Sequence, residues 1–518
     1  MTLRGWRAAG VAFLAGALAA LAMPPLHWLP LAIVGAVAFV WLWDTAPGPK
    51  SALLWGWAWG TGHFAVGSYW IVEAFFVPPA DYAPLGPPIV IGLAALLGFF
   101  PGMAAGAAKW AAGRWPALGG RYARLLLLAV TWTVAEWLRG HVFTGYAWNP
   151  LAHVWAFAVP LLQGAALFGV YGLGLFTFMI LAAPAAGWRA SLLALAVVAG
   201  AGFAGQSVMA PAETGDGPLV RIVQPNTPQA EKWRPENRAR QVNKLVEMSR
   251  RDGFDRLAAV IWPETAPPFI VEPGSPALEV MAKAVPPGGY LLTGAARGTR
   301  NRDEGVWNSL LVIDGAGEIV ATYDKNHLVP LGEYIPFHKQ LAAMLLWINR
   351  SGLAPVSGSI GRGSFEVGES RVTLDLPRLP SFSPIICYEV IFPAAVTGPG
   401  ARPRWLLNVT NDAWFGLSSG PYQHLASARL RSVEEGLPMI RAANTGVSAV
   451  IDAYGRVLAA LDMEQEGIID HRIPPAREPT PYGRWGDGTL LVLLLLAAGA
   501  LALFGRGPSG KKSGISSR

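Results

Sequence analysis

Long apolar runs at the two ends of the chain constrain its fold more than any other feature. A bilayer core about 30 Å thick requires about 20 mostly apolar residues in an α-helix. Eight runs approach or reach that length, although several are short or rich in glycine. These candidate spans are residues 8–23, 28–43, 51–76, 88–112, 122–138, 160–186, 189–206 and 488–506. The sequence therefore predicts a multi-span α-helical membrane domain.

The first apolar run has a second interpretation. Arg4 and Arg7 precede it and Ala-Leu-Ala follows at 20–22, a pattern that also fits a cleavable signal peptide. A second apolar run begins shortly afterwards, and removal of the first would leave an odd number of spans. We therefore expect the first run to be a membrane span.

The basic residues predict the orientation in the membrane, because short cytoplasmic loops are enriched in Lys and Arg. With the N-terminus in the cytoplasm, the short outer loops carry only Arg139. The inner segments then carry 12 basic residues, namely Arg4, Arg7, Lys50, Lys109, Arg114, Arg121, Arg124, Arg189, Arg506, Lys511, Lys512 and Arg518. Both termini are therefore expected in the cytoplasm, and the long segment before the last span is expected outside it.

That long segment has the composition of a different kind of domain. We expect a membrane domain at 1–212, an outer domain at 213–487, and a last span with a basic tail at 488–518. The whole chain carries a net charge of +7, but the outer domain holds 28 basic and 30 acidic residues. The positive charge thus reflects topology. Because the outer domain has no dense basic tract, we do not expect it to bind nucleic acid.

Short β-branched apolar runs alternate with turn signals along the outer domain. The candidate strands are 219–224, 258–262, 290–294, 308–313, 318–323, 384–388, 405–410, 446–452 and 467–471. Helical patterns over 231–252 and 421–436 are interleaved with them. This alternation predicts an α/β domain with layered sheets. The apolar stretch 341–348 is too short to span a bilayer and fits either a core helix or a segment that dips into the membrane.

Glu264, Lys325 and Cys387 each come at or just after the end of a predicted strand. In α/β proteins, ligands usually bind at the carboxyl ends of strands. Each signal alone is weak, since a lone cysteine is most often a buried small hydrophobe and a Glu–Lys pair can be a surface salt bridge. Together the three supply a nucleophile, a carboxylate base and a cation, which covalent acyl transfer requires.

The chain contains a single cysteine, which excludes an intramolecular disulfide and a Cys-cluster metal site. A thiol with a pKa of about 8.5 is mostly protonated at neutral pH. A nearby Lys325 ammonium would favour the thiolate, and Glu264 could accept the thiol proton and later that of the incoming nucleophile. We expect no metal and no cofactor, because His327, His338 and His424 lack ligand spacing and no nucleotide-binding fingerprint is present.

This combination resembles the nitrilase superfamily, and more specifically the apolipoprotein N-acyltransferase family, its integral membrane branch. The resemblance covers essentially the whole chain. In the membrane domain it rests on Glu136-Trp137-Leu138-Arg139-Gly140 and on 143–145. In the outer domain it rests on Lys232-Trp233, Trp262-Pro263-Glu264, 325–333, Cys387-Tyr388-Glu389, 411–416, 420–429 and 441–446.

The resemblance implies an αββα sandwich with a Glu264–Lys325–Cys387 triad and a ping-pong reaction. Cys387 would attack the sn-1 ester of a phospholipid such as phosphatidylethanolamine, leaving a thioester and a lysophospholipid. The α-amine of the N-terminal diacylglyceryl-cysteine of an apolipoprotein would then take the acyl chain. The implied location is the bacterial inner membrane, with the catalytic domain on the periplasmic side.

The same resemblance implies four supporting residues. Glu333 would be a second carboxylate, and Trp233, Tyr388 and Glu389 would shape the site, with the Tyr388 backbone N–H as an oxyanion donor. Purely structural roles stay open, because Trp233 could serve packing alone and Glu389 could pair with an arginine.

Two alternatives to an acyltransferase remain. A nitrilase-type amidase would hydrolyse a C–N bond with the same triad, water resolving the thioester, but it would not need eight spans. A non-enzymatic transporter or scaffold would keep its function after Cys387→Ala. The roles of Glu136 and Arg139 are also open: charged groups are costly in lipid, and the pair could either hold the domain near lipid headgroups or be purely structural.

Overall fold

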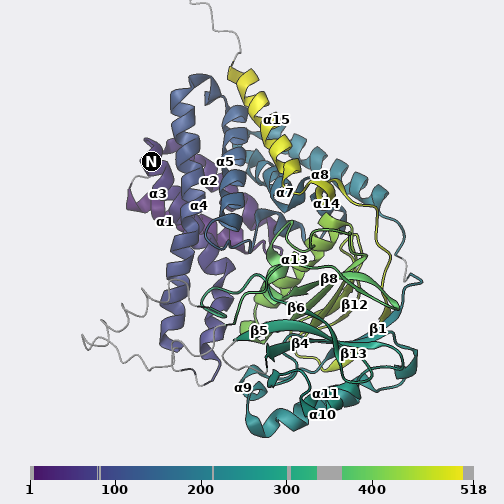
Figure 1. Ribbon diagram of the computed structural model, residues 1–518. Helices are drawn as coiled ribbons and strands as arrows, with labels where there is room; N and C mark the ends of the chain where they lie inside the picture. The colour runs from purple at the N-terminus through teal and green to yellow at the C-terminus, as the bar shows by residue number, and fades with distance from the viewer. Residues whose placement is uncertain are drawn as a thin grey trace, which may run out of the picture. The chain divides into compact units, whose positions relative to one another are not determined.

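The computed structural model describes residues 5–78, 80, 83–212, 215–299, 305–334 and 365–505 (Figure 1). The apolar stretch 341–348 lies outside the described residues. The chain divides into two compact units. The helical unit comprises Met1–Phe76, Ala80–Ala210 and Pro479–Arg518, and the α/β unit comprises Val77–Pro79 and Pro211–Glu478.

The helical unit is built mainly from apolar α-helices. They are α1 (Trp6–Ala20), α2 (Leu29–Thr45), α3 (Pro49–Gly67), α4 (Gly86–Arg114), α5 (Arg121–His141), α6 (Val159–Leu162), α7 (Ala165–Ala182), α8 (Trp188–Val208), α14 (Pro481–Trp485) and α15 (Gly488–Gly505). Short 3₁₀ segments are η1 (Tyr69–Phe76), η2 (Ala83–Leu85), η3 (Pro116–Gly119), η4 (Leu151–Trp155) and η5 (Ala183–Ala186).

Three helical segments among the described residues are long and apolar enough to cross a membrane. These are Ala83–Arg114, Ala165–Ala186 and Trp188–Val208. Apolar but shorter helices are Trp6–Ala20, Leu29–Thr45 and Gly488–Leu503. Close packing of α3 and α4 depends on small residues, since a Cβ on Gly60 would lie 2.7 Å from the Cα of Gly98. Such contacts are typical of helices that pack without a hydrophobic driving force between them.

Two of the expected spans are interrupted, which corrects their boundaries. The run 51–76 is α-helical only as far as Gly67 and continues as the 3₁₀ segment η1. The run 160–186 bends at Gly169, whose φ of 67° lies in the left-handed region. Glycine adopts that conformation without a Cβ clash, and hydropathy carries no information about such a bend.

Two β-sheets form the centre of the α/β unit. The first sheet has the order β13-β1-β2-β4-β5-β6, with β3 beside β4, and the second has the order β12-β11-β10-β9-β8-β7. The first contains β1 (Leu219–Gln224), β2 (Ala259–Trp262), β3 (Ile270–Val271), β4 (Tyr290–Gly298), β5 (Val306–Ile313), β6 (Ile319–Asp324) and β13 (Gly467–Arg472). The second contains β7 (Leu374–Leu376), β8 (Leu379–Ile386), β9 (Trp405–Thr410), β10 (Met439–Ala443), β11 (Ser448–Ile451) and β12 (Val457–Leu461).

Helices cover the outer faces of the two sheets (Figure 1). The helices of this unit are α9 (Gln229–Lys232), α10 (Arg238–Ser249), α11 (Pro276–Ala282) and α13 (Gly420–Glu435), and its 3₁₀ segments are η6 (Pro235–Asn237), η7 (Phe254–Arg256), η9 (Cys387–Ile391) and η10 (Asp412–Phe415). Alternate residues of β1 point to different cores. Ile222 packs with Phe382 and Ile440 of the second sheet, whereas Val223 packs with Leu245 of α10. The predicted layered α/β architecture is therefore confirmed, as two mixed sheets between helices.

The strand predictions need two corrections. The run 384–388 begins earlier, at Leu379, and its strand ends at Ile386, so that Cys387 starts the 3₁₀ segment η9. Four strands were not predicted, namely β3, β7, β10 and β12. The predicted helix 421–436 is close to α13, which has Pro421 in its first turn and stops at Gly436, whose φ is 65°.

Candidate active site

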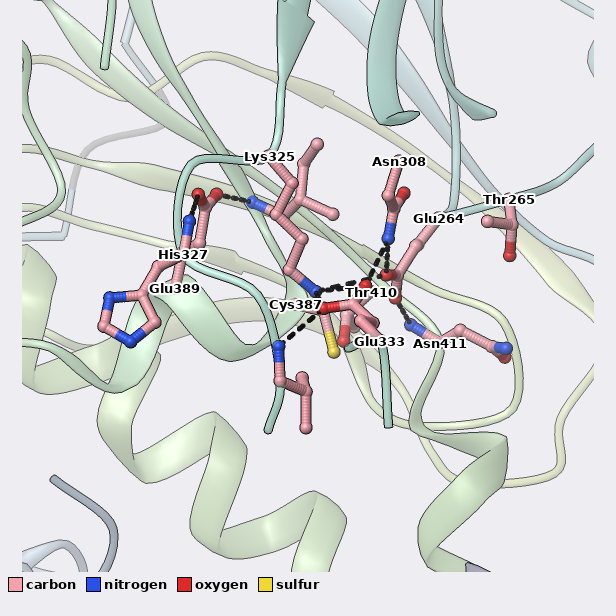
Figure 2. A network of polar contacts seen from close by, with 12 residues as sticks. Glu264, Thr265, Asn308, Lys325, His327, Glu333, Cys387, Glu389, Thr410 and Asn411 are labelled. Atoms are coloured by element: carbon pink, nitrogen blue, oxygen red, sulfur yellow. Dashed lines mark hydrogen bonds and ion pairs between the residues drawn. The ribbon is translucent and has the colours of Figure 1, made fainter. Parts of the chain in front are cut away.

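Strand ends at one edge of the sandwich bring Glu264, Lys325 and Cys387 together (Figure 2). Glu264 follows β2, Lys325 follows β6 and Cys387 follows β8. Strand β2 is parallel to β4, β5 is antiparallel to β4, and β6 is antiparallel to β5, so β2 and β6 end on the same side of the sheet. The Lys325 Nζ lies 3.7 Å from Glu264 Oε1, and both charges act on the Cys387 thiol.

The Glu264 carboxylate is buried and oriented through both of its oxygens. Asn308 Nδ2 donates to Oε1 at 2.7 Å, and the backbone N–H of Asn411 donates to Oε2 at 2.7 Å. Only 8% of the side-chain surface is exposed. These donors fix the direction of the carboxylate next to the thiol while leaving its second lone pairs available as a base.

Lys325 is held mainly by Glu333. Its Nζ donates to Glu333 at 2.9 Å from Oε1 and 2.8 Å from Oε2, and the residue is fully buried. The backbone N–H of Val329 donates to Glu333 Oε2 at 2.8 Å. Burial alone would lower the pKa of Lys325, but the charges of Glu333 and Glu264 outweigh it and raise that pKa. Lys325 is therefore a permanent cation in this site.

Cys387 has a left-handed backbone conformation and a thiol whose pKa is raised. Its φ is 51°, in the left-handed region, and its side chain is hydrogen-bonded to Thr410. Burial raises the pKa of the thiol, the Glu264 charge raises it further, and Lys325 opposes both. Lys325 lowers the pKa of the thiol as expected, but burial and Glu264 outweigh this effect. Cys387 is therefore a protonated thiol at rest and needs a base to react.

Glu389 joins the segment after β6 to the turn that carries Cys387. Its Oε1 accepts hydrogen bonds from Tyr323 Oη at 2.7 Å, from the backbone N–H of Asn326 at 2.8 Å and from that of His327 at 3.1 Å. Its Oε2 accepts from the backbone N–H of Ile386 at 2.7 Å. Burial raises the pKa of Glu389 despite these donors. No arginine pairs with Glu389 in the described part of the chain.

The other two expected supporting residues differ in exposure. Tyr388 is buried, and its ring contacts Phe392 and His327 at centroid distances of 5.1 and 5.8 Å. Trp233 directly follows α9 and remains 41% exposed.

Two further residues lie in the site but were not predicted to do so from the sequence. Lys232 is buried, and its Nζ donates to the Glu264 carbonyl at 3.2 Å and to Thr265 Oγ1 at 2.8 Å. Burial lowers the pKa of Lys232 to about 8, against the attraction of Glu264. Asn308 bridges the two carboxylates, since its Nδ2 also donates to Glu333 Oε1 at 2.9 Å. The only sequence feature that pointed to Asn308 was its position as a polar residue at the start of the predicted strand 308–313.

Glu136 and Arg139 belong to the helical unit. Arg139 Nη1 donates to the carbonyls of Tyr146 and Trp148, the latter at 2.7 Å, and its Nη2 lies 3.7 Å from Glu136 Oε1. The backbone N–H of Leu151 donates to Glu136 at 2.8 Å. These contacts tie α5 to the segment that follows it, which favours a structural role. No cluster suited to a metal ion occurs among the residues that the structure describes.

Sequence comparisons match nearly the whole chain to known protein families. Residues 15–205 match the family model described as apolipoprotein N-acyltransferase N-terminal domain, and residues 219–480 match the carbon-nitrogen hydrolase model. A protein from Rhodopseudomonas palustris named apolipoprotein N-acyltransferase is 37% identical over 533 residues, covering 97% of this chain and 96% of its own. The chain belongs to the apolipoprotein N-acyltransferase family. A relative from Brucella melitensis with the same name is 39% identical over 536 residues and covers 97% of each chain.

Membership of the apolipoprotein N-acyltransferase family confirms the resemblance seen in the sequence. The α/β unit has the nitrilase-like fold of the carbon-nitrogen hydrolases, with a helical region before it. A solved carbon-nitrogen hydrolase superfamily protein from Xanthomonas campestris aligns at a TM-score of 0.35 and 18% identity, covering 57% of this chain and 98% of its own. The family assignment rests on the full-length relatives and not on this alignment.

Proposed function

We propose that the protein transfers an acyl chain from a phospholipid to the α-amine of the N-terminal diacylglyceryl-cysteine of apolipoproteins, through a thioester on Cys387. The observation that carries the proposal is the buried contact between Glu264 and Lys325 beside the chain's one thiol. Relatives that match the chain over nearly its full length are named for this acyl transfer.

Acylation begins when Glu264 accepts the thiol proton as Cys387 Sγ attacks the sn-1 ester carbon. The tetrahedral oxyanion is stabilised by the Lys325 ammonium and the backbone N–H of Tyr388. Collapse breaks the ester C–O bond, and Glu264 returns the proton to the leaving lysophospholipid. Because the resting thiol has a raised pKa, a base this close is what permits the attack.

Deacylation uses the same groups in reverse. The neutral α-amine of the acceptor attacks the thioester carbon, an N–C bond forms and the C–S bond breaks. Glu264 takes the proton that the nitrogen loses and passes it to the Cys387 thiolate, which restores the resting enzyme. Amines attack thioesters readily, so no cofactor is required for either half-reaction.

We assign 1–212 and 488–518 to a multi-span membrane domain and 213–487 to a catalytic domain on the periplasmic side of the bacterial inner membrane. The apolar helices and the bias of basic residues toward one side support this orientation. Both proposed substrates, a phospholipid and a diacylglyceryl-anchored protein, lie in the membrane, which explains why a nitrilase-like catalytic domain is joined to such helices.

The decisive experiment incubates the detergent-solubilised protein with phosphatidylethanolamine and no acceptor. We expect the peptide containing Cys387 to gain the mass of one acyl chain, and Cys387→Ala to gain none. An active protein that never carries this adduct would contradict the covalent mechanism.

Adding an acceptor distinguishes acyl transfer from the amidase alternative. A synthetic diacylated lipopeptide should become triacylated while the adduct on Cys387 disappears. An amidase would leave the lipopeptide diacylated, and any acyl adduct on Cys387 would be lost to water at the same rate with or without the lipopeptide. The helical unit favours the transferase, because a hydrolase of small soluble amides needs no lipid-facing helices.

A further inference from the structure

A second polar network lies behind Cys387, and neither half-reaction described above uses it. Its side chains come from four different elements: Thr410 ends β9, Asp412 starts η10, His424 lies in α13 and Arg441 lies in β10. All four are at most 1% exposed. Four polar groups buried this deeply are costly unless their hydrogen bonds are well made.

The network contacts Cys387 at two points. His424 Nε2 lies 3.1 Å from the carbonyl oxygen of Cys387, and the Thr410 hydroxyl is hydrogen-bonded to the Cys387 side chain. Asp412 Oδ1 joins both contacts, because it lies 2.9 Å from His424 Nδ1 and accepts a hydrogen bond from Thr410 at 2.8 Å. Arg441 Nη2 donates to Asp412 Oδ2 at 2.7 Å.

The proton positions of this network follow from its acceptors. A carbonyl oxygen only accepts, so His424 Nε2 carries a hydrogen whether the ring is neutral or charged. Burial and Arg441 lower the pKa of His424, against the attraction of Asp412. Burial opposes ionisation of Asp412, but Arg441 and His424 lower its pKa to about 2. Asp412 is thus a carboxylate at every working pH.

The backbone of Cys387 needs such support. A φ of 51° is strained in a residue other than glycine and persists only where the surroundings impose it. Glu389 fixes the residue before Cys387 through the Ile386 N–H. His424 fixes the other side, through the Cys387 carbonyl.

We propose that His424, Thr410 and Asp412 form a positioning cluster that holds Cys387 in its left-handed backbone conformation and aims Sγ at Glu264 and Lys325. Asp412 is the common anchor, and Arg441 keeps it in place. The inference rests on the proposed function only in that Cys387 is the nucleophile. The three side chains are buried behind Cys387, so each acts through Cys387.

Two substitutions of His424 test the cluster because each keeps half of the ring's contacts. The amide nitrogen of His424→Gln can occupy the place of Nε2 and donate to the Cys387 carbonyl. The shorter side chain of His424→Asn can reach Asp412 but not that carbonyl. We expect the rate of acyl-adduct formation to fall about 100-fold in His424→Asn and no more than about 10-fold in His424→Gln, because small misplacements of a reacting group carry large rate penalties.

The same two His424 variants distinguish an effect on the position of Cys387 from an effect on the stability of the protein. Both variants leave a buried partner unsatisfied, so we expect similar decreases in thermal unfolding temperature. His471→Asn, at a half-buried position on β13, serves as the control and should match the wild type in both measurements. If adduct formation falls equally in the two His424 variants, or falls in proportion to stability, the cluster is only structural.

Thr410→Val provides an independent test at the thiol. Valine keeps the shape of threonine but removes the hydroxyl, whereas Thr322→Val changes an exposed residue of β6. We expect iodoacetamide to alkylate Cys387 about 10-fold more slowly in Thr410→Val and at the wild-type rate in Thr322→Val. The single hydrogen of the Thr410 hydroxyl goes to Asp412, so its oxygen accepts from the thiol, and removing it releases Sγ from its place beside Glu264 and Lys325. Equal rates would overturn the role of Thr410.

Failure of this inference is distinguishable from failure of the proposed function. Alkylation of Cys387 requires no acyl donor, so it reports on the thiol even if the protein is not an acyltransferase. A wild-type protein that forms no acyl adduct refutes the proposed function. A wild-type protein that forms the adduct, with variants that do not differ from it, refutes the positioning cluster.

Discussion

The two carboxylates beside Lys325 have different tasks, as their contacts show. Glu333 makes the short hydrogen bonds to Lys325 Nζ, whereas Glu264 stands 3.7 Å away and is oriented by Asn308 and a backbone N–H. A carboxylate bound tightly to an ammonium is a poor base, because the cation stabilises its ionised form. Glu264 is therefore the better proton acceptor, and Glu333 maintains the charge of Lys325.

Substitution of each glutamate by glutamine should separate these tasks. Glu264→Gln removes the base, and we expect the rate of acyl-adduct formation to fall by about 10²–10⁴. Glu333→Gln leaves the base but loosens Lys325, so we expect a smaller loss, about 10-fold to 100-fold. Both rates come from the mass of the Cys387 peptide over time. Exposed Glu236 in η6 supplies the control, and a Glu264→Gln variant with the wild-type rate would remove Glu264 from the mechanism.

Lys232 should make stability depend on alkaline pH. Burial lowers its pKa from 10.5 to about 8, so between these values the unfolded chain binds more protons than the folded one. Stability therefore rises with pH across this window, by about 3 kcal/mol, since one pKa unit corresponds to 1.36 kcal/mol. Below pH 8 the lysine is charged in both states and the full burial penalty applies.

The measurement compares thermal unfolding of the wild type and Lys232→Met at pH 7.5 and pH 10. The wild type should gain stability relative to the variant between the two values. Lys283→Met, at an exposed lysine that follows α11, should run parallel to the wild type. Parallel curves for Lys232→Met would mean that Lys232 titrates as an ordinary lysine.

Local pattern was enough to single out Glu264, Lys325 and Cys387, because each comes at or just after the end of a predicted strand, and the structure places the three side by side. The left-handed backbone of Cys387 was not predictable, since it depends on contacts from α13 and β9 that are distant in the chain. His424 illustrates the same limit. Its spacing in the sequence did not suggest a metal ligand, but its contact with Cys387 exists only after α13 packs against η9.

Among the elements, strand β10 was missed for a physical reason. Arg441 interrupts its apolar pattern, and an arginine is normally solvent-exposed. In the structure this side chain is fully buried, because Asp412 and Asn408 accept its hydrogen bonds. Strand β1 also contains a buried arginine, Arg221, but it was predicted with its observed limits because Val220, Ile222 and Val223 are β-branched, whereas Ile440 is the one β-branched residue of β10. Strand β9 was likewise predicted with its observed limits.

Strand β4 supports the base through a glycine. A Cβ on Gly294 would come 2.8 Å from the Pro263 carbonyl oxygen and closer still to the Glu264 backbone. We expect Gly294→Ala to destabilise the protein by about 1–3 kcal/mol and to reduce adduct formation, because overpacking moves the backbone that carries the base. Gly315→Ala is the matched control, since no atom lies within 4 Å of its added Cβ. Equal unfolding temperatures for the two variants would contradict this account.

At the scale of the whole molecule, composition was the main guide to how the chain is divided. Mean hydropathy and the bias of basic residues predicted a chain divided into two kinds of structure, and the two compact units have that character. Hydropathy could not predict the break after Gly67 or the bend at Gly169, because both depend on backbone conformation and not on polarity.

The orientation of the chain can be tested because Cys387 is its only cysteine. A Cys387→Ser background has no thiol, so single cysteines report on one position each. Lys50 lies in the first turn of α3, among the segments predicted to face the cytoplasm, and exposed Lys283 lies in the α/β unit. In intact spheroplasts, a membrane-impermeant maleimide should label Lys283→Cys, but it should label Lys50→Cys only after permeabilisation. The opposite pattern would invert the proposed topology, because 12 of the 13 basic residues of the helical segments would then face outward against the charge bias of membrane proteins.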